Sequence, residues 1–167
     1  MGSEGRGKGP RILFTEDRIA HAHELVGALS DEGYVAELAE TAEDAIMALR
    51  STGYAAMLLD VQLPLGESEK PEMPDGVHPD RVGIELLRHL RAIPELSLVP
   101  VIVISGLDYR TFWDGMVREL QGDELHAISV IPKPAGPREV IRELARITGW
   151  QGPLFRAFKA DDPSYGE

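Results

Sequence analysis

The chain has 167 residues, 43% of them hydrophobic and 27% charged, a length and composition that suffice for one well-packed domain but not for two ordinary ones. It carries 17 Lys and Arg against 28 Asp and Glu, and the formal charge of -11 argues against direct binding to nucleic acid or anionic lipid. Because cysteine is absent, disulfides, thiolate metal sites and a cysteine nucleophile are excluded. No apolar run is long enough for a membrane span or has the pattern of a signal peptide, so we expect a cytoplasmic protein without a membrane partner.

Residues 1–10 are rich in glycine and polar residues and predict a flexible N-terminal tail. Beyond the tail, short apolar segments alternate with amphipathic helical patterns, and Thr41 is a typical helix N-cap. The first strand runs directly into two adjacent acids, Glu16 and Asp17. The first half of the chain thereby predicts strands over 12–15, 34–38 and 55–59, separated by helices that end near Gly33 and Gly53.

The third of these strands is a continuous apolar run that ends in a single carboxylate, Asp60, and is closed by Pro64. Such a run is typical of a strand buried on both faces of a sheet, and open α/β sheets bind ligands at the ends of such strands. An aspartate in this position also commonly begins a turn. Asp60 by itself therefore leaves both a catalytic role and a purely local role open.

Residues 65–80 follow this strand and make its connection about fifteen residues longer than most βα loops. The insertion holds Pro71, Pro74 and Pro79 together with several acids, which predicts a polar loop that contributes little to the core. Because it is tethered directly after Asp60, it must lie beside the mouth of any site built there. Two interpretations stay open, a gate that selects among partners and a tolerated insertion without effect.

The second half of the chain continues the alternation of apolar strands and amphipathic helices. It predicts a helix around 84–90, a strand over 99–104, a helix over 109–120, a strand over 127–131 and a helix from Pro137 to Gly149. This spacing is typical of βαβ units with parallel strands and right-handed crossovers. The predicted fold class is α/β, a doubly wound parallel sheet of five strands with helices on both faces.

Polar side chains stand at the ends of the first, third, fourth and fifth strands, which lie along one edge of a doubly wound sheet. Three carboxylates in one place repel one another unless a cation lies among them, and oxygen ligands suit Mg²⁺. A hydroxyl and an ammonium group opposite would hold the oxygens of a phosphoryl group on Asp60. The residues that predict this phosphoryl acceptor are Glu16, Asp17, Asp60, Ser105 and Lys133.

The chain resembles the receiver domain of two-component response regulators in four motifs, Phe14-Thr15-Glu16-Asp17, Leu59-Asp60-Val61-Gln62-Leu63-Pro64, Ile104-Ser105-Gly106 and Pro132-Lys133-Pro134. The resemblance covers residues 11–149 and implies a flavodoxin-like sheet with strand order 2-1-3-4-5. It also implies a cis peptide bond between Lys133 and Pro134.

By this resemblance, Asp60 is the phosphoacceptor, Lys133 contacts the phosphoryl group and Ser105 is the switch hydroxyl. Magnesium would be held by Glu16, Asp17, Asp60 and the backbone carbonyl of Gln62. The implied activity is that of a phospho-accepting signalling receiver rather than an enzyme. The implied partners are a histidine kinase or a histidine phosphotransfer protein as donor and a downstream protein. Whether the chain also pairs with a second copy of itself stays open.

Two features depart from the family pattern. Val130 stands where receivers usually carry Tyr or Phe, so the aromatic switch residue is missing, and the second departure is the insertion at 65–80.

Residues 150–167 are too few for an output domain and predict a stand-alone regulator with a C-terminal tail. Two fates stay open for the apolar residues of this tail, folding back onto the domain or engaging another protein; they are Trp150, Leu154, Phe155 and Phe158.

Two other classes of function compete with a phosphorylation-switched receiver. A receiver-like adaptor would bind its partner constitutively, with the insertion or Val130 having silenced the switch. A haloacid-dehalogenase-like phosphatase also uses an aspartate after a strand, but it needs a second acid two residues later, where this chain has Gln62. The sequence therefore favours a signalling protein over an enzyme.

Overall fold

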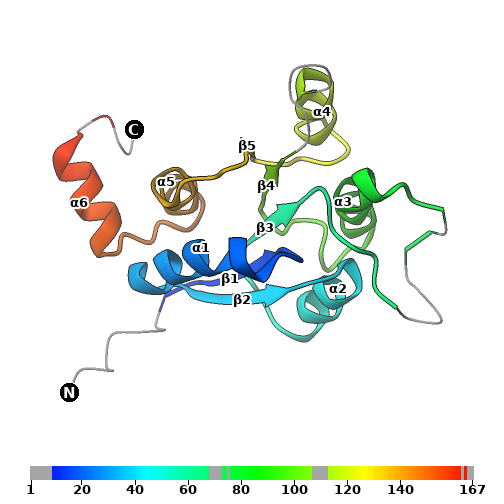
Figure 1. Cartoon of the computed structure of the whole chain (residues 1–167), viewed down its shortest axis with the longest axis horizontal. Helices are drawn as coiled ribbons and strands as arrows, with labels where there is room; N and C mark the ends of the chain where they lie inside the picture. Colours follow the sequence, from blue (N-terminus) through cyan, green and yellow to red (C-terminus); the bar gives the residue numbers. More distant parts are fainter. Residues whose placement is uncertain (1–8, 68–72, 75, 107–112, 163, 165–167) are drawn as a thin grey trace.

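The structure is a computed structural model that describes residues 9–67, 73–74, 76–106, 113–162 and 164. Within them lies a five-stranded sheet in which all strands are parallel, in the order β2-β1-β3-β4-β5 (Figure 1). The strands are β1 Arg11–Thr15, β2 Val35–Ala39, β3 Ala56–Asp60, β4 Val101–Ser105 and β5 Ser129–Pro132. The predicted fold class and strand order are confirmed.

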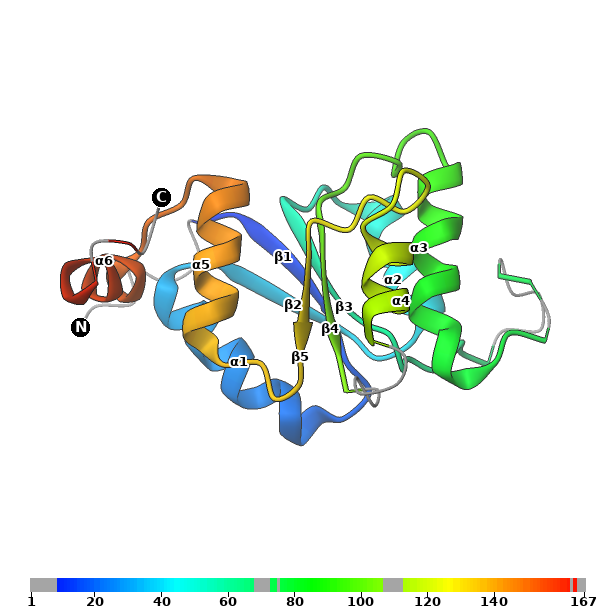
Figure 2. The same cartoon turned by 90° about the horizontal axis from the view of Figure 1, so that it is seen from above.

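Helices cover both faces of the sheet (Figure 2). On one face lie α1 Ile19–Glu32 and α5 Pro137–Thr148, and on the other α2 Ala42–Ser51, α3 Val82–Ala92 and α4 Trp113–Leu120. Side chains of a central parallel strand alternate between the two covered faces, so Leu58 of β3 packs with α1 and α5 while Leu59 packs with α2 and α3. Among the described residues, no helix combines the length and apolarity needed to cross a membrane.

Local signals in the sequence set several of the element limits. Thr41 accepts a hydrogen bond at 3.1 Å from the Asp44 N–H and caps α2, as predicted. Helix α1 ends at Gly33, whose φ of 98° lies in the left-handed region that favours glycine. The predicted strands overlap the observed ones, with ends shifted by no more than two residues. The helix predicted over 109–120 is described from Trp113 onward, and 109–112 lie outside the described residues.

The insertion between β3 and α3 contributes more to the core than its composition predicts. Met73 is 3% exposed and belongs to the hydrophobic cluster shared by α2, α3 and α4, and Leu65 and Val77 pack against that cluster. The expectation of a loop that adds little to the core is therefore wrong for these residues, since a few apolar side chains among many polar ones suffice to anchor the loop. The insertion ends in a short 3-10 helix, η1 Pro79–Arg81, and its residues 68–72 and 75 lie outside the described part.

Most of the predicted N-terminal tail, residues 1–8, also lies outside the described part of the chain. The two described residues of this segment contact the start of β2. The Gly9 N–H donates to the Gly33 carbonyl at 3.0 Å, and the Pro10 carbonyl accepts from the Val35 N–H at 3.0 Å. Gly9 and Pro10 are therefore hydrogen-bonded to the residue that ends α1 and to the first residue of β2.

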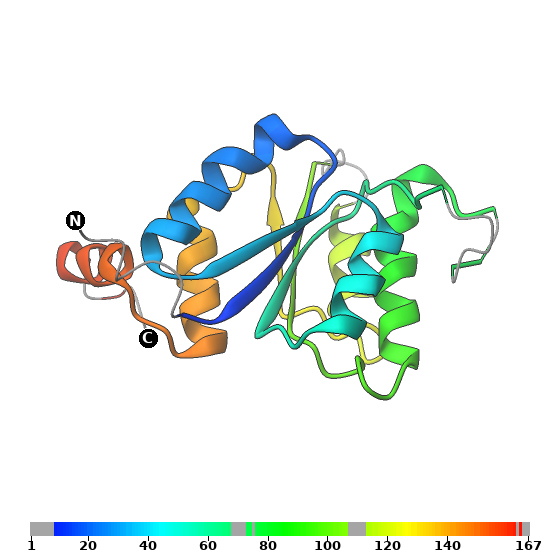
Figure 3. The ribbon, with the colours of Figure 1, turned by 90° about the horizontal axis from the view of Figure 1, so that it is seen from below.

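Residues after α5 fold back onto the domain as α6 Pro153–Asp161, which lies beside α1 and α5 (Figure 3). Phe155 is 3% exposed and sits in the hydrophobic cluster that α1 and α5 form on their face of the sheet. Trp150 Nε1 donates to the Glu32 carbonyl at 2.8 Å and ties the start of this segment to the end of α1. Of the two fates that the sequence leaves open for these apolar residues, the structure shows the first.

Glu32, at the end of α1, is a buried acid beneath α6. It is 1% exposed, and its Oε2 accepts a hydrogen bond at 3.0 Å from the Phe155 N–H. Burial raises the pKa of Glu32 against the opposing effect of the backbone hydrogen bonds from α6. Because folding raises the pKa of Glu32, the ionised side chain destabilises the folded state. The stability contributed by this group is complete below the unfolded-state pKa of Glu32 and is lost as pH rises through its folded-state pKa.

We therefore expect Glu32→Gln, which removes the charge and keeps an acceptor for Phe155, to raise the melting temperature at neutral pH. The advantage should shrink as pH falls toward about 4.3, the ordinary pKa of glutamate. Thermal unfolding at a series of pH values measures this dependence. Glu24→Gln, at an exposed position on the same helix, is the matched control and should change little. An advantage that is the same at every pH would contradict the assigned role of the Glu32 charge.

Candidate functional site

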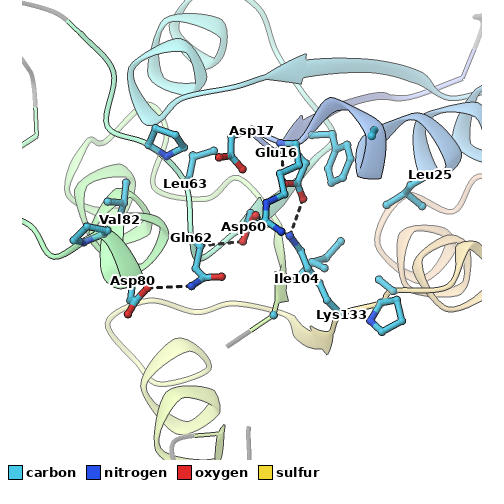
Figure 4. Close-up of a pocket in the computed structure, with 18 of the residues that line it drawn as sticks. Glu16, Asp17, Leu25, Asp60, Gln62, Leu63, Asp80, Val82, Ile104 and Lys133 are labelled. Carbon is cyan, nitrogen blue, oxygen red and sulfur yellow. Dashed lines mark hydrogen bonds and ion pairs between the residues drawn. The ribbon is translucent and has the colours of Figure 1, made fainter. Parts of the chain in front are cut away.

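The carboxyl ends of β1, β3 and β5 open into one cleft of about 930 Å³ (Figure 4). Glu16 and Asp17 follow β1, Asp60 is the last residue of β3, and Lys133 follows β5. All of these side chains line the cleft. The structure thus brings together most of the polar residues that the strand pattern places at this edge.

Asp60 is held in place by hydrogen bonds from its neighbours. Its N–H donates to Thr15 Oγ1 at 3.0 Å, and the Thr15 hydroxyl donates in turn to the Leu58 carbonyl at 3.1 Å, which joins the ends of β1 and β3. The backbone N–H of Gln62 donates to Asp60 Oδ1 at 2.9 Å. With 3% of its surface exposed, the Asp60 side chain has a fixed orientation toward the cleft.

Three acids meet at this point. Carboxylate oxygens of Glu16, Asp17 and Asp60 all lie within 4.8 Å of one another. Glu16 and Asp60 are buried, whereas Asp17 is exposed at the mouth. Mg²⁺ binds oxygen ligands in a near-octahedral shell at about 2.0–2.1 Å, which puts ligand oxygens about 3–4 Å from one another. The arrangement of the three carboxylates therefore fits a hard divalent cation such as Mg²⁺.

Lys133 supplies a positive charge to the same site. Its Nζ donates to Asp60 Oδ2 and to Glu16 Oε2, at 2.8 Å in each case. Burial by itself lowers the pKa of Lys133, but the hydrogen bonds and charges of Asp60 and Glu16 prevail and raise that pKa. The ammonium group therefore stays charged. The next peptide bond, Lys133–Pro134, is cis, as the family resemblance implies.

The two buried acids respond differently to this environment. Burial raises the pKa of Asp60 despite the hydrogen bonds from Lys133 and the Gln62 N–H, and the charge of Glu16 adds to the rise. Burial also disfavours ionised Glu16, but hydrogen bonds from Lys133 and the Arg18 N–H lower the pKa of Glu16 below its ordinary value. An additional cation among the acids would favour the charged form of Asp60.

Gln62 joins this site to the end of the insertion. Its Nε2 donates to Asp80 Oδ1 at 3.0 Å, as Figure 4 shows. Asp80 lies in η1. Asp80, Val77 and Pro79 all line the cleft. Described residues of the insertion thus form one wall of the cleft. The magnesium-binding role predicted for the Gln62 backbone carbonyl stays a prediction.

Gly83, in the first turn of α3, is a site residue that sequence patterns did not single out. Its N–H donates to the Val61 carbonyl at 2.9 Å, and a Cβ atom at this position would lie 2.3 Å from the Asp60 carbonyl oxygen. Glycine is unfavourable inside a helix, so a glycine at the start of an otherwise apolar helical pattern was the sequence signal that could have identified this position. The missing side chain allows α3 to approach the end of β3.

Ser105 ends β4 at the same edge of the sheet, but its hydroxyl is directed toward α4. It donates to Met116 Sδ at 3.8 Å, and the Ser105 side chain is 1% exposed. On β5, Val130 is partly buried against the cluster of α2, α3 and α4. The switch role of Ser105 stays a prediction, as does the effect of Val130 on switching.

The crowding of acids leads to a stability prediction. We expect Asp60→Asn to raise the melting temperature in chelator, because it removes the charge of a buried carboxyl group whose pKa is raised. Each kcal/mol gained in stability should raise the melting temperature by about 2–4 °C. Mg²⁺ should raise the melting temperature of the unmodified protein more than that of Asp60→Asn. Asp123→Asn, a change at an exposed residue that does not line the cleft, is the control. The acid-pocket interpretation fails if neither effect appears in thermal unfolding.

No protein-family model matches the chain, and no protein of curated function matches it. Solved structures match it over most of its length. One is the receiver domain of the sensor histidine kinase PA1611 from Pseudomonas aeruginosa PAO1, which has a magnesium ion coordinated in its active site cleft. It is 23% identical with a TM-score of 0.64, and the match covers 84% of this chain and 98% of that chain.

Two further structures extend this likeness. The signal receiver domain of a signal transduction histidine kinase from Syntrophus aciditrophicus is 26% identical with a TM-score of 0.65, covering 84% of this chain and 91% of that one. A CheY-like response regulator receiver domain protein from Methanospirillum hungatei JF-1 is 23% identical with a TM-score of 0.63, covering 83% and 93%. The chain therefore has the receiver fold, and the resemblance to response regulator receiver domains is confirmed. This likeness supports a role in two-component signalling.

Proposed function

We propose that this chain is a phospho-accepting receiver of a two-component phosphorelay, in which Asp60 is phosphorylated with the help of Mg²⁺ and its phosphorylation changes binding to another protein. The observation that carries the proposal is the position of Lys133 Nζ, 2.8 Å from both Asp60 and Glu16. A buried carboxylate, a group of three acids that fits a cation and a fixed ammonium group lie together at one cleft. This is the set of groups that phosphoryl transfer to a carboxylate requires.

In the proposed transfer, an Asp60 oxygen forms a bond to the phosphorus of the donor while the bond from phosphorus to the leaving atom breaks, and that electron pair leaves with the donor. The Gln62 N–H keeps Asp60 Oδ1 oriented, and Lys133 pairs with a phosphoryl oxygen in place of Asp60 Oδ2. Glu16, Asp17, Asp60 and the Gln62 carbonyl would hold Mg²⁺. A bound Mg²⁺ would neutralise part of the charge of the acids and of the incoming phosphoryl group.

The proposed donor is a phosphohistidine on a histidine kinase or a histidine phosphotransfer protein. Receiver domains of histidine kinases are among the solved structures with this fold, which supports a donor of this class. Residues 11–149 form the proposed receiver domain, with 150–167 as an appended segment, and we place the protein in the cytoplasm. The proposal assigns the chain acceptor chemistry and the loss of its own phosphoryl group, and no separate enzymatic reaction.

Incubation with acetyl phosphate and Mg²⁺, followed by intact mass spectrometry, tests the proposal. We expect the mass of one phosphoryl group to be gained, and Asp60→Ala to abolish the gain. Asp80→Ala is the matched control, because Asp80 is an acid that lines the same cleft and stands outside the group of three acids, so this variant should still be phosphorylated. An equal mass gain in Asp60→Ala would show that the phosphoacceptor is another residue.

Val130 favours a second candidate function, a receiver-like adaptor that binds its partner whatever its phosphorylation state. An aliphatic side chain partly buried in the core offers no ring to move when the site is phosphorylated. Hydrogen exchange of the unmodified and phosphorylated proteins separates the two candidates. A change in protection on α4, β5 or α5 supports a switch, and unchanged protection over the whole chain supports the adaptor.

A further inference from the structure

Ser105 stands between two residues that face the cleft. Ile104 and Gly106 line it, whereas the hydroxyl of Ser105 donates to Met116 Sδ of α4 at 3.8 Å. The side chain is 1% exposed, so solvent does not compete for this hydroxyl. In the parallel pairing of β4 with β5, Ser105 lies beside Pro132, the residue before Lys133. A donor group within the phosphoacceptor edge is therefore held toward a helix rather than toward Asp60.

Met116 is fixed by its own surroundings. It is 8% exposed and lies in the hydrophobic cluster of α2, α3 and α4, where Leu120, one turn further along α4, is fully buried. Glu119, on the same helix, pairs with Arg81 at 2.6 Å and with Arg88 at 3.2 Å, which ties α4 to the start and middle of α3. The sulfur atom is thus presented to Ser105 by a helix that is anchored independently.

The Met116 sulfur and a phosphoryl oxygen differ greatly in strength as acceptors for the Ser105 hydroxyl. A thioether sulfur is a weak hydrogen-bond acceptor, whereas an ionised phosphoryl oxygen forms a charge-assisted bond about twice as strong as a neutral one. A phosphoryl group on Asp60 would therefore outcompete Met116 for the hydroxyl. In the unmodified protein, Ser105 can turn toward the cleft only after its hydrogen bond to the Met116 sulfur is broken.

We propose that Met116 is a positioning residue that holds the Ser105 hydroxyl away from the cleft in the unmodified protein and yields it to the phosphoryl group on Asp60. The inference rests on the proposed function and assigns that site a control element on α4. Because the sulfur belongs to α4, the same exchange of partners reports the state of Asp60 to that helix. Position 116 thereby offers a link between site and surface that does not require an aromatic residue at 130.

The initial rate of phosphorylation by acetyl phosphate, followed by intact mass, tests this role in two variants whose expected changes in rate are opposite. Met116→Leu removes the acceptor at similar volume and should raise the rate about threefold, since one weak hydrogen bond no longer has to be broken. Met116→Gln places a stronger acceptor, an amide oxygen, at the same position and should lower the rate about threefold. Both effects should vanish when Ser105 is alanine, because the coupling is specific to the hydroxyl.

Met47→Leu, a change at a methionine that is 67% exposed on α2, is the control and should leave the rate unchanged. A merely structural role of Met116 predicts shifts in the same direction for Leu and Gln, or shifts that persist with Ser105→Ala, and either result overturns the inference. If Met116→Gln does not fold, the Met116→Leu and Ser105→Ala pair still decides by whether the increase disappears. If no protein gains mass, the proposed function itself is wrong and the inference falls with it.

Discussion

Replacing Lys133 by alanine is expected to slow phosphorylation of Asp60 by acetyl phosphate by roughly 10²–10³-fold, the usual loss when a preorganised donor is removed from a transfer site. Its Nζ is the cation that the structure places 2.8 Å from the Asp60 carboxylate and 2.8 Å from the Glu16 carboxylate. Without it, the charge that develops on the phosphoryl oxygens would be met only by Mg²⁺ and the Ser105 hydroxyl. The measurement is the rate of mass gain at saturating Mg²⁺.

The same variant should also lose stability, because Glu16 and Asp60 are each 3% exposed at the side chain and would be left without their shared partner. Breaking a buried pair from one side costs about 3–5 kcal/mol, and Mg²⁺ should recover part of this loss. Lys133→Met keeps most of the apolar stem and separates lost packing from lost charge. Lys159→Ala, exposed on α6, is the control for removing a lysine. A rate within a factor of about two of the unmodified protein would contradict the transition-state role, whatever the change in stability.

The fold was predictable from the sequence because its central strands carry unambiguous patterns. β3 and β4 are fully buried, and each reads as an uninterrupted apolar run of the length that a covered parallel strand needs. Once these strands were placed, the right-handed βαβ rule left few topologies to consider. The limits of the strands were less certain, since an apolar residue such as Val99 precedes β4 without joining its ladder.

The residues at strand ends were predictable for the same reason, while contacts between distant elements were not. The rule that carboxyl ends of parallel strands share one edge brings Glu16, Asp60 and Lys133 together, and the structure joins them through hydrogen bonds. Nothing in the sequence pairs Ser105 with Met116, because that contact depends on how α4 is placed over the sheet. Periodicity identifies the apolar face of a helix, but it does not identify the side chain that this face meets.

The C-terminal segment illustrates the same limit. Its spacing of Leu154, Phe155 and Phe158 is compatible with a helix, yet the partner surface is formed by α1 and α5, whose sheet-facing sides already account for most of their apolar residues. Glu32 became informative only in the structure, where the start of α6 covers it and donates to its carboxylate. A lone glutamate near a helix end reads from sequence as solvated surface.

Gly83→Ala is expected to destabilise the fold by about 3 kcal/mol, the upper part of the range for an added group that the structure cannot accommodate. The new Cβ would lie 2.3 Å from the Asp60 carbonyl oxygen and 2.6 Å from Val61 Cα, and both are backbone atoms that cannot rotate away. Relief requires α3 to move off the end of β3. The phosphoacceptor would shift with that junction, so the phosphorylation rate should fall together with the melting temperature.

Gly27→Ala provides the matched control, because Gly27 is also helical and a Cβ atom there would meet nothing within 4 Å. Removing a glycine from an open helix position should stabilise the protein by roughly 0.5–1 kcal/mol, which is the gain that Gly83→Ala would also show if only helix propensity mattered. The two substitutions are chemically identical and should have opposite signs in thermal or denaturant unfolding. Equal stabilisation in both would mean that α3 does not depend on a close approach to β3, and that the geometry of the Asp60 edge is set by the strands alone.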